Sequence, residues 1–160
     1  MDEKKKVILK LENICQSYVV GNSVKDAAEN VSLEVYDNEF LVILGPGHCG
    51  KTVLMNIIAG LEKPIGGKVY LDGEEVHGSD RRIGMVFQSY ELFPHMTVLD
   101  NVLLAPTKVQ KRPKAEVQQE AEALLDRVGL LAKKNSYPRE LSGGQKQRVA
   151  IVRALCMHPE

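Results

Sequence analysis

The sequence contains an eight-residue segment whose composition suits the binding of a phosphate group. It fits the pattern G-x-x-x-x-G-K-[ST] and consists of Gly45, Pro46, Gly47, His48, Cys49, Gly50, Lys51 and Thr52. Glycines allow the backbone to wrap around a phosphate with N–H groups pointing inward, and a helix starting near Gly50 adds its positive dipole end. Lys51 can reach the β- and γ-phosphates of a nucleotide, and the Thr52 hydroxyl can ligate Mg²⁺. The segment lies between an apolar run and a helical pattern, as a phosphate-binding loop requires.

Two residues in or beside this loop, His48 and Val53, are unusual for it, and a third, Cys49, could be reactive. His48 adds a bulky side chain where glycine is favoured. Three interpretations are open: His48 is a solvated loop residue, it makes an extra phosphate contact, or it weakens phosphate binding. Val53 offers no hydroxyl to a phosphate. Cys49 lies at the helix start, where a thiolate is stabilised, so we expect that alkylating Cys49 blocks nucleotide binding.

A second segment could bind an anion without a lysine. It is Leu-Ser-Gly-Gly-Gln at 141–145, and its polar part consists of Ser142, Gly143, Gly144 and Gln145. A serine and two bare amides at a helix start can bind a phosphate, although a plain N-cap followed by a turn explains the same residues. Two such helix ends, about ninety residues apart, suggest two copies of the chain joined around a shared nucleotide.

The elements that must position these segments begin with β structure. Alternating patterns predict half-buried strands at 7–11 and 31–35, with a turn at Gly21 between them. The continuous apolar run 40–44 predicts a strand buried on both faces of a parallel sheet, and 83–87 predicts another short strand. Residues 69–76 predict a hairpin around Asp72-Gly73.

The rest of the pattern is helical. A helix over 53–61 should be buried on nearly every side. Thr97, with Asp100 three residues later, can form a capping box. Pro113 opens a helix whose apolar stripe leads to Gly129, a natural C-cap, and the helix after Ser142 should end at Pro159. The stripe consists of Val117, Ala121, Leu124, Leu125 and Val128.

Composition narrows the function classes. The 160 residues fit one globular domain, with 44% hydrophobic and 26% charged residues. Acidic and basic side chains balance to a formal net charge of zero, so we expect no nucleic-acid partner. Cys15, Cys49 and Cys156 have neither zinc-ligand nor disulfide-framework spacing. Residues 1–6 lack the apolar run of a signal peptide, and no segment approaches the roughly 20 apolar residues of a membrane span. If this protein works at a membrane, we expect another chain to hold it there.

The two phosphate segments together resemble the ATP-binding subunits of ABC transporters. Leu141–Gln145 resembles the ABC signature, and the resemblance runs from Val7 to Glu160. It implies that Gln88 is the Q-loop glutamine, which approaches Mg²⁺ and the attacking water, and that Tyr18 stacks on adenine. Strand-end packing is the alternative for Tyr18, and a plain strand-end polar residue is the alternative for Gln88.

The resemblance implies an α/β fold of the P-loop NTPase class, an ABC-type nucleotide-binding domain with an N-terminal β subdomain and an α-helical subdomain. The C-terminal part of the core is expected to be absent, so residues 1–160 form one incomplete domain. Its parts are a β and P-loop core at 1–88, a helical subdomain at 89–145, and a helix returning to the core at 146–160. ATP and Mg²⁺ are the implied ligands, with Thr52 and Gln88 at the metal, and Ser142–Gln145 acting across a homodimer.

Some segments resemble bacterial importers. Residues 90–98 are similar to importer subunits generally, 149–155 to those for amino acids, and 57–64 to those for sulfonate or nitrate. The implied partners are transmembrane permease subunits, and the implied location is peripheral, on the cytoplasmic face of the inner membrane. Leu92 and Phe93 could contact the permease or simply pack in their loop.

The family continues after the equivalent of Glu160 with a strand ending in Asp-Glu, which supplies the general base. We therefore expect this chain to be a fragment that binds ATP weakly and hydrolyses it barely or not at all. Two alternatives remain open. One is a soluble ABC protein acting on ribosomes or DNA, and the other is a non-catalytic or regulatory partner of a complete cassette.

Overall fold

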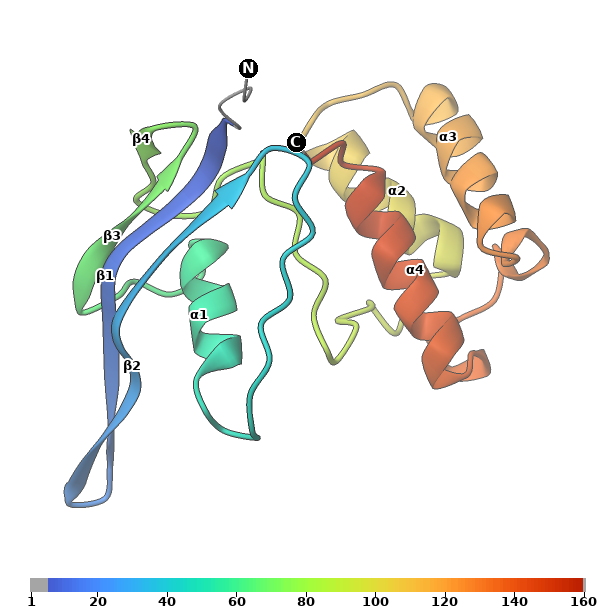
Figure 1. The fold of residues 1–160 in the computed structure, drawn as a ribbon. Helices are drawn as coiled ribbons and strands as arrows, with labels where there is room; N and C mark the ends of the chain where they lie inside the picture. Colours follow the sequence, from blue (N-terminus) through green and yellow to red (C-terminus); the bar gives the residue numbers. More distant parts are fainter. Residues whose placement is uncertain (1–5, 160) are drawn as a thin grey trace. The chain divides into compact units, whose positions relative to one another are not determined.

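The computed structural model describes residues 6–159 and divides into two compact units (Figure 1). The first unit ends at Asp80 and the second begins at Arg81. The fold is the α/β ABC-type fold that the sequence predicted, with β structure in the first unit and helices in the second. No helix among the described residues is long and apolar enough to cross a membrane.

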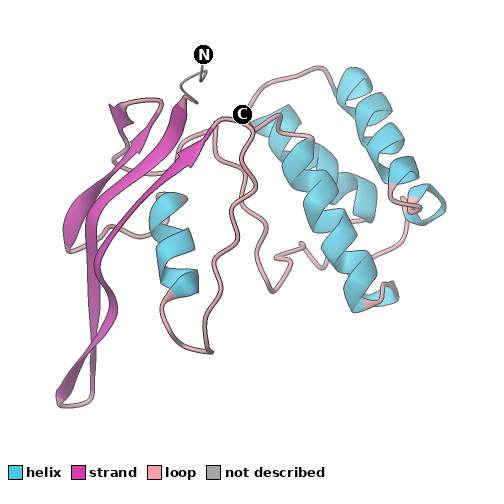
Figure 2. Cartoon of the chain, viewed as in Figure 1, coloured by secondary structure: helices cyan, strands magenta, loops and turns pink. Residues whose placement is uncertain are grey.

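The first unit is built on a four-stranded antiparallel sheet with the order β2-β1-β3-β4 (Figure 2). Its strands are β1 (Val7–Val20), β2 (Ser23–Tyr36), β3 (Gly66–Leu71) and β4 (Glu74–Glu75). The strands predicted at 7–11 and 31–35, the turn at Gly21 and the hairpin at Asp72-Gly73 are confirmed. β1 and β2 are longer than predicted because bulges between Leu11 and Gln16 shift the register, which breaks the sequence alternation without ending the strands.

The core of this unit lies between the sheet and helix α1 (Lys51–Ile58). Its buried members are Leu11, Ile14, Leu54, Ile57 and Val69. The helix buries one face only, since Met55 remains 44% exposed, and it ends before Leu61, which is also exposed. The expectation of a helix buried on nearly every side was wrong, because the sheet covers α1 from one side.

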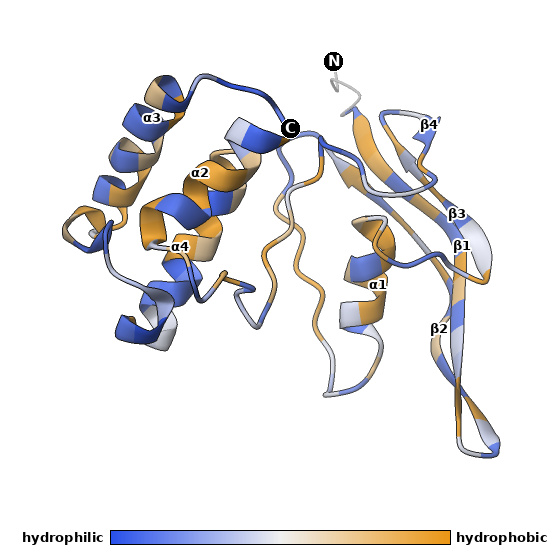
Figure 3. Cartoon of the chain, turned by 180° about the vertical axis from the view of Figure 1, so that it is seen from behind, coloured by the Kyte–Doolittle hydropathy of each residue, from blue (hydrophilic) through white to orange (hydrophobic). Residues whose placement is uncertain are grey.

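The run 40–44 forms no strand in this structure, contrary to the prediction. Phe40 is 91% exposed and Leu44 is 86% exposed, and only Ile43 packs against the core. The loop that leads into α1 therefore displays apolar residues (Figure 3). A strand buried on both faces needs hydrogen-bonding neighbours, and the four described strands of this sheet pair only with one another. The predicted strand at 83–87 is a loop for the same reason.

The second unit is helical. It contains α2 (Val98–Lys108), α3 (Lys114–Arg127) and α4 (Gly143–Leu155), with short 3₁₀ turns at Leu131–Lys133 and Pro138–Glu140. Its core draws on all three helices, through residues including Val98, Val102, Val117, Ala121, Leu125, Val149 and Val152. Helix α4 thus packs within this unit, while the division of the chain at 88 and 145 stays a prediction.

The helix ends follow local sequence signals. The Thr97 hydroxyl accepts a hydrogen bond from the Asp100 N–H at 3.1 Å and is the N-cap of α2. The Asp100 carboxylate accepts from the Thr97 hydroxyl at 2.7 Å instead of from the Thr97 N–H, so only half of the predicted capping box forms. Gly129 adopts φ +70° after α3, and the N–H groups of Gly129 and Leu130 donate to the carbonyls of Asp126 and Leu125. These two bonds form a Schellman motif. Helix α4 ends at Leu155, four residues before the predicted stop at Pro159.

The buried stripe of α3 allows a test of the helical core. Leu125 is fully buried, so Leu125→Ala should lower the free energy of unfolding by about 2–5 kcal/mol through lost apolar contacts and a cavity. Gln119→Ala, on the exposed side of the same helix, should change it by less than about 0.5 kcal/mol. Urea unfolding followed by circular dichroism measures both. Equal effects of the two substitutions would contradict the packing described for α3.

Candidate functional site

The loop Gly45–Gly50 holds the Lys51 ammonium group inside its own curve. Lys51 Nζ donates hydrogen bonds to the carbonyls of Gly45 at 2.8 Å and Pro46 at 2.7 Å. The same nitrogen lies 3.3 Å from the Cys49 sulfur. A positive charge is therefore already placed where an anion bound by this loop would sit.

Helix α1 starts at this loop with free amide donors. Gly50 is its N-cap residue, no side chain caps the first turn, and no acidic residue lies there. Helix N-termini with unsatisfied N–H groups attract anions. Thr52 is exposed in this first turn and Val53 is half-buried, so the Thr52 hydroxyl is accessible to a ligand.

Gly50 is required by the backbone. It adopts φ +89°, and a Cβ atom there would lie 1.8 Å from the Ala27 carbonyl oxygen. No residue with a side chain fits this contact, so the loop can approach strand β2 only through glycine.

His48 and Cys49 are both exposed in the loop. His48 adopts φ +62°, a conformation that favours glycine, so the loop carries strain at this position. A Cβ atom at Gly45 would lie 2.8 Å from the Cys49 sulfur, which shows how closely that side chain folds against the loop. Any ligand in the loop would meet the Cys49 thiol beside the lysine.

Tyr18 lies on β1 and is 38% exposed. Its hydroxyl donates a hydrogen bond to the Glu62 carboxylate, and this bond, together with burial, raises the pKa of Tyr18. The same carboxylate oxygen accepts a hydrogen bond from the buried Gln16 amide at 2.6 Å. Glu62 follows the C-terminal end of α1, whereas the loop with Lys51 lies at its N-terminal end. Glu62 and Gln16 carry no motif that sequence reasoning could have used.

Gln88 is exposed in a turn of the second unit. The turn is closed by the Tyr90 N–H, which donates to the Phe87 carbonyl at 3.0 Å. Two consecutive residues after it, Tyr90 and Glu91, adopt positive φ angles of 66° and 45°.

Ser142 caps helix α4. Its hydroxyl oxygen accepts from the Gln145 N–H at 3.3 Å, and the Ser142 N–H donates to the Gln145 side-chain oxygen at 2.9 Å. This reciprocal pair is a capping box. Because the hydroxyl serves as an acceptor here, its own proton can still be donated to an anion. Gly143 and Gly144 follow, both exposed.

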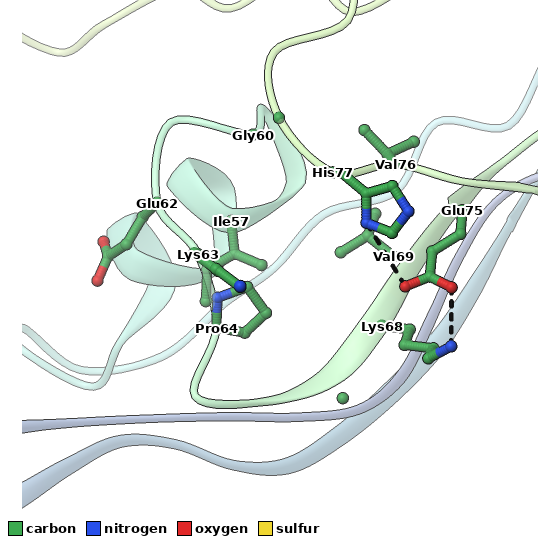
Figure 4. A pocket seen from close by; sticks show the side chains of 12 residues that line it. Ile57, Gly60, Glu62, Lys63, Pro64, Lys68, Val69, Glu75, Val76 and His77 are labelled. Carbon is green, nitrogen blue, oxygen red and sulfur yellow. Dashed lines mark hydrogen bonds and ion pairs between the residues drawn. The ribbon is translucent and has the colours of Figure 1, made fainter.

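A separate cavity of about 170 Å³ lies beside the C-terminal end of α1 and strands β3 and β4 (Figure 4). Glu75 stands between Lys68, at 2.7 Å, and the His77 ring nitrogen, at 3.7 Å. The hydrogen bond between Lys68 and Glu75 lowers the pKa of Glu75 and raises the pKa of Lys68. None of the residues predicted from the sequence to bind a ligand lines this cavity, so it is not the nucleotide site that the motifs predict.

Comparisons with known proteins agree with the class that the loop and fold define. The family model described as ABC transporter matches residues 28–160. An uncharacterised ABC transporter ATP-binding protein of Methanocaldococcus jannaschii is 48% identical over 99% of this chain and 59% of its own length. The arginine transport ATP-binding protein ArtM of Bacillus subtilis is 40% identical over 96% of this chain and 65% of its own.

Solved structures show the same fold. A dimeric structure of the ABC transporter cassette MJ0796 superposes with a TM-score of 0.87 and 38% identity, over 95% of this chain and 71% of that one. The chain therefore belongs to the ABC transporter family, as part of an ATP-binding domain. It spans about three-fifths of the length of the two relatives described above.

The residues present fit Mg²⁺ and ATP as ligands. The loop supplies a lysine ammonium and uncapped amides for phosphates, and Thr52 supplies one hydroxyl for a metal. No group of three or more His, Cys, Asp and Glu side chains within residues 6–159 is arranged to hold a metal ion. This is compatible with Mg²⁺, which usually takes only one or two protein ligands and binds substrate phosphates and water besides.

Removing the lysine charge tests the loop. Lys51→Ala should weaken MgATP binding about tenfold or more, because a charge-assisted contact to phosphate is lost. Lys133→Ala, which truncates an exposed lysine of the helical unit, is the matched control and should leave affinity unchanged. Titration with a fluorescent ATP analogue measures both affinities. Unchanged affinity after Lys51→Ala would contradict a phosphate-binding role for this loop.

The three free cysteines provide a second test. Alkylation by N-ethylmaleimide should occur first at exposed Cys49 and block ATP binding, and ATP should protect this thiol. Cys156 is an internal control, because burial raises its pKa to about 11 and keeps it protonated. Peptide mass spectrometry locates the label. A chain labelled at Cys49 that binds ATP as before would refute the expectation.

Proposed function

We propose that this chain is the nucleotide-binding part of an ABC transporter subunit that uses ATP-driven dimerisation and hydrolysis to power solute import. The observation that carries the proposal is the pair of helix starts with complementary chemistry. One places the Lys51 ammonium in a loop with uncapped amides, and the other presents Ser142 beside two bare glycines. Each suits the terminal phosphates of a nucleotide from a different direction.

In the proposed site, Lys51 and the first amides of α1 bind the β- and γ-phosphates and stabilise charge as the terminal bond breaks. Thr52 and Gln88 are the proposed Mg²⁺ ligands, and the ion would supply positive charge to stabilise the phosphates. Ser142 and Gly144 of a second copy donate to the γ-phosphate and close the site. We assign the general base to no residue of this chain.

The loop residues near the site have narrower proposed roles. Pro46, Gly47, His48, Cys49 and Val53 line the phosphate loop, while Gly143 and Gln145 complete the signature from the partner copy. Tyr18 stacks on the adenine, and its exposed fraction of 38% leaves part of the side chain accessible for this contact. The Glu62 carboxylate would fix the phenol by its hydrogen bond.

The proposed partners are transmembrane permease subunits, with the protein held at the cytoplasmic face of the membrane. Leu92 packs against the helical core, whereas Phe93 is 42% exposed beside His95. Phe93 is therefore the better candidate for a contact with a permease. The relative from Bacillus subtilis, whose name states arginine transport, supports import of amino acids as the cargo class.

A trans-complementation experiment tests the two-copy site. Ser142→Asp keeps a good N-cap, so α4 keeps its start, but places a negative charge against the phosphate. Neither Lys51→Ala nor Ser142→Asp alone should dimerise with MgATP. A one-to-one mixture should dimerise with one ATP per two chains, because only the mixed dimer contains one site with both halves intact.

Analytical ultracentrifugation and nucleotide counting read the result, with Lys133→Ala as the dimerising control. A Ser142→Asp chain that dimerises like the unaltered protein would show that Ser142 is only a helix cap. No recovery in the mixture would sink the shared-site arrangement. Copurification of nucleic acid, or of a complete cassette without membrane subunits, would favour the soluble or regulatory alternatives instead.

A further inference from the structure

The helix that begins at the signature is also tied to the turn that carries Gln88. Arg153, in the last turn of α4, donates from one guanidinium nitrogen to the Glu91 carbonyl at 2.6 Å. Its second nitrogen donates to the Tyr90 carbonyl at 2.9 Å. One side chain of α4 thus binds two consecutive carbonyls that lie 62 and 63 residues earlier in the chain.

The backbone that Arg153 binds is strained. Tyr90 and Glu91 both have positive φ angles, although neither is glycine. A left-handed conformation is unfavourable for such residues and persists where surrounding contacts hold it. Within the turn, the Ser89 hydroxyl donates to the Glu91 carboxylate at 2.5 Å. Arg153 supplies the contact from outside the turn.

Partial burial of the Arg153 side chain favours its hydrogen bonds to these two carbonyls. The side chain is half-buried, and this burial lowers the pKa of its guanidinium, although the group stays charged. A partly buried charge needs hydrogen-bond acceptors, and those at this position are the two main-chain oxygens.

The same turn reaches the other end of α4. A Cβ atom at Gly143 would lie 3.5 Å from the Tyr90 hydroxyl oxygen, which is ordinary van der Waals contact. The Tyr90 hydroxyl therefore lies near the first residue of α4, while the Tyr90 carbonyl is bound by Arg153 in the last turn. We call the group of Tyr90, Glu91 and Arg153 the clasp.

We propose that Arg153 is a positioning residue that, through the clasp, makes the Gln88 turn and the Ser142–Gln145 segment move as one body. The role in nucleotide turnover rests on the proposed function, whereas the mechanical link does not. A nucleotide that bound either segment would then order the other, because the strained turn cannot shift without breaking two charge-assisted hydrogen bonds.

Amide hydrogen exchange on the full chain without nucleotide tests the clasp. Arg153→Met keeps an unbranched apolar stem but removes both donors. Exchange should become about tenfold faster, or more, in peptides covering 87–91 and 143–148, while the core peptide 117–125 stays unchanged. Arg153→Lys keeps the charge but not the planar pair of donors, so its exchange rates in these two peptides should lie between those of the native chain and of Arg153→Met. Arg127→Met, on the exposed surface of α3, is the matched control and should change nothing.

Each outcome decides the proposal. Equal acceleration in all three peptides would mean that Arg153 supports the unit as a whole, and exchange unchanged from the native chain would mean that it holds nothing; either result overturns the clasp. If Arg153→Met does not fold, Arg153→Lys decides alone, since it must loosen the two segments selectively. Repeating the series with MgATP then separates the proposals. A native chain with no nucleotide effect would refute the proposed function and leave the nucleotide-free result standing.

Discussion

The contact between the Lys51 ammonium group and the carbonyls of its own loop is the interaction on which the candidate site depends. It holds a positive charge against two main-chain oxygens of a loop that leads into a helix with no acidic residue in its first turn. The loop can take this shape only because Gly50 approaches the Ala27 carbonyl with no Cβ atom in the way. Strand β2, helix α1 and the lysine are therefore parts of one arrangement, and the sheet positions the charge.

Features set by neighbouring residues were predicted well from the sequence. The caps at Thr97 and Ser142, the Gly129 motif and the Asp72-Gly73 hairpin each depend on a few consecutive residues, and each was found. The strands at 40–44 and 83–87 were not, because an apolar run indicates that a segment can be buried and says nothing of whether a pairing strand is beside it. Bulges hid the true length of β1 for a related reason, since they reverse which side chains face the core.

In the candidate site, too, residues in local motifs could be predicted from the sequence, and their distant partners could not. Motif spacing predicted Lys51, Thr52 and Ser142 as site residues, and the family resemblance predicted Gln88; these assignments stay predictions. Neither could identify Glu62 as the partner of Tyr18, or Arg153 as the partner of Tyr90, because those contacts join residues 44 and 63 positions apart. Such pairs carry no local signal, and only the folded chain brings them together.

The two segments proposed to bind phosphate also differ in how far they could be separated from this protein. The capping box at the start of α4 is complete within four residues, Ser142 to Gln145, and both of its hydrogen bonds join residues of this segment. The cap of such a segment is portable: grafted onto the front of an unrelated helix, it should keep these two hydrogen bonds, although it would lose the proposed link to the Gln88 turn. The Lys51 loop is not portable in this sense, since its conformation depends on the close approach of Gly50 to Ala27 of strand β2, more than twenty residues away.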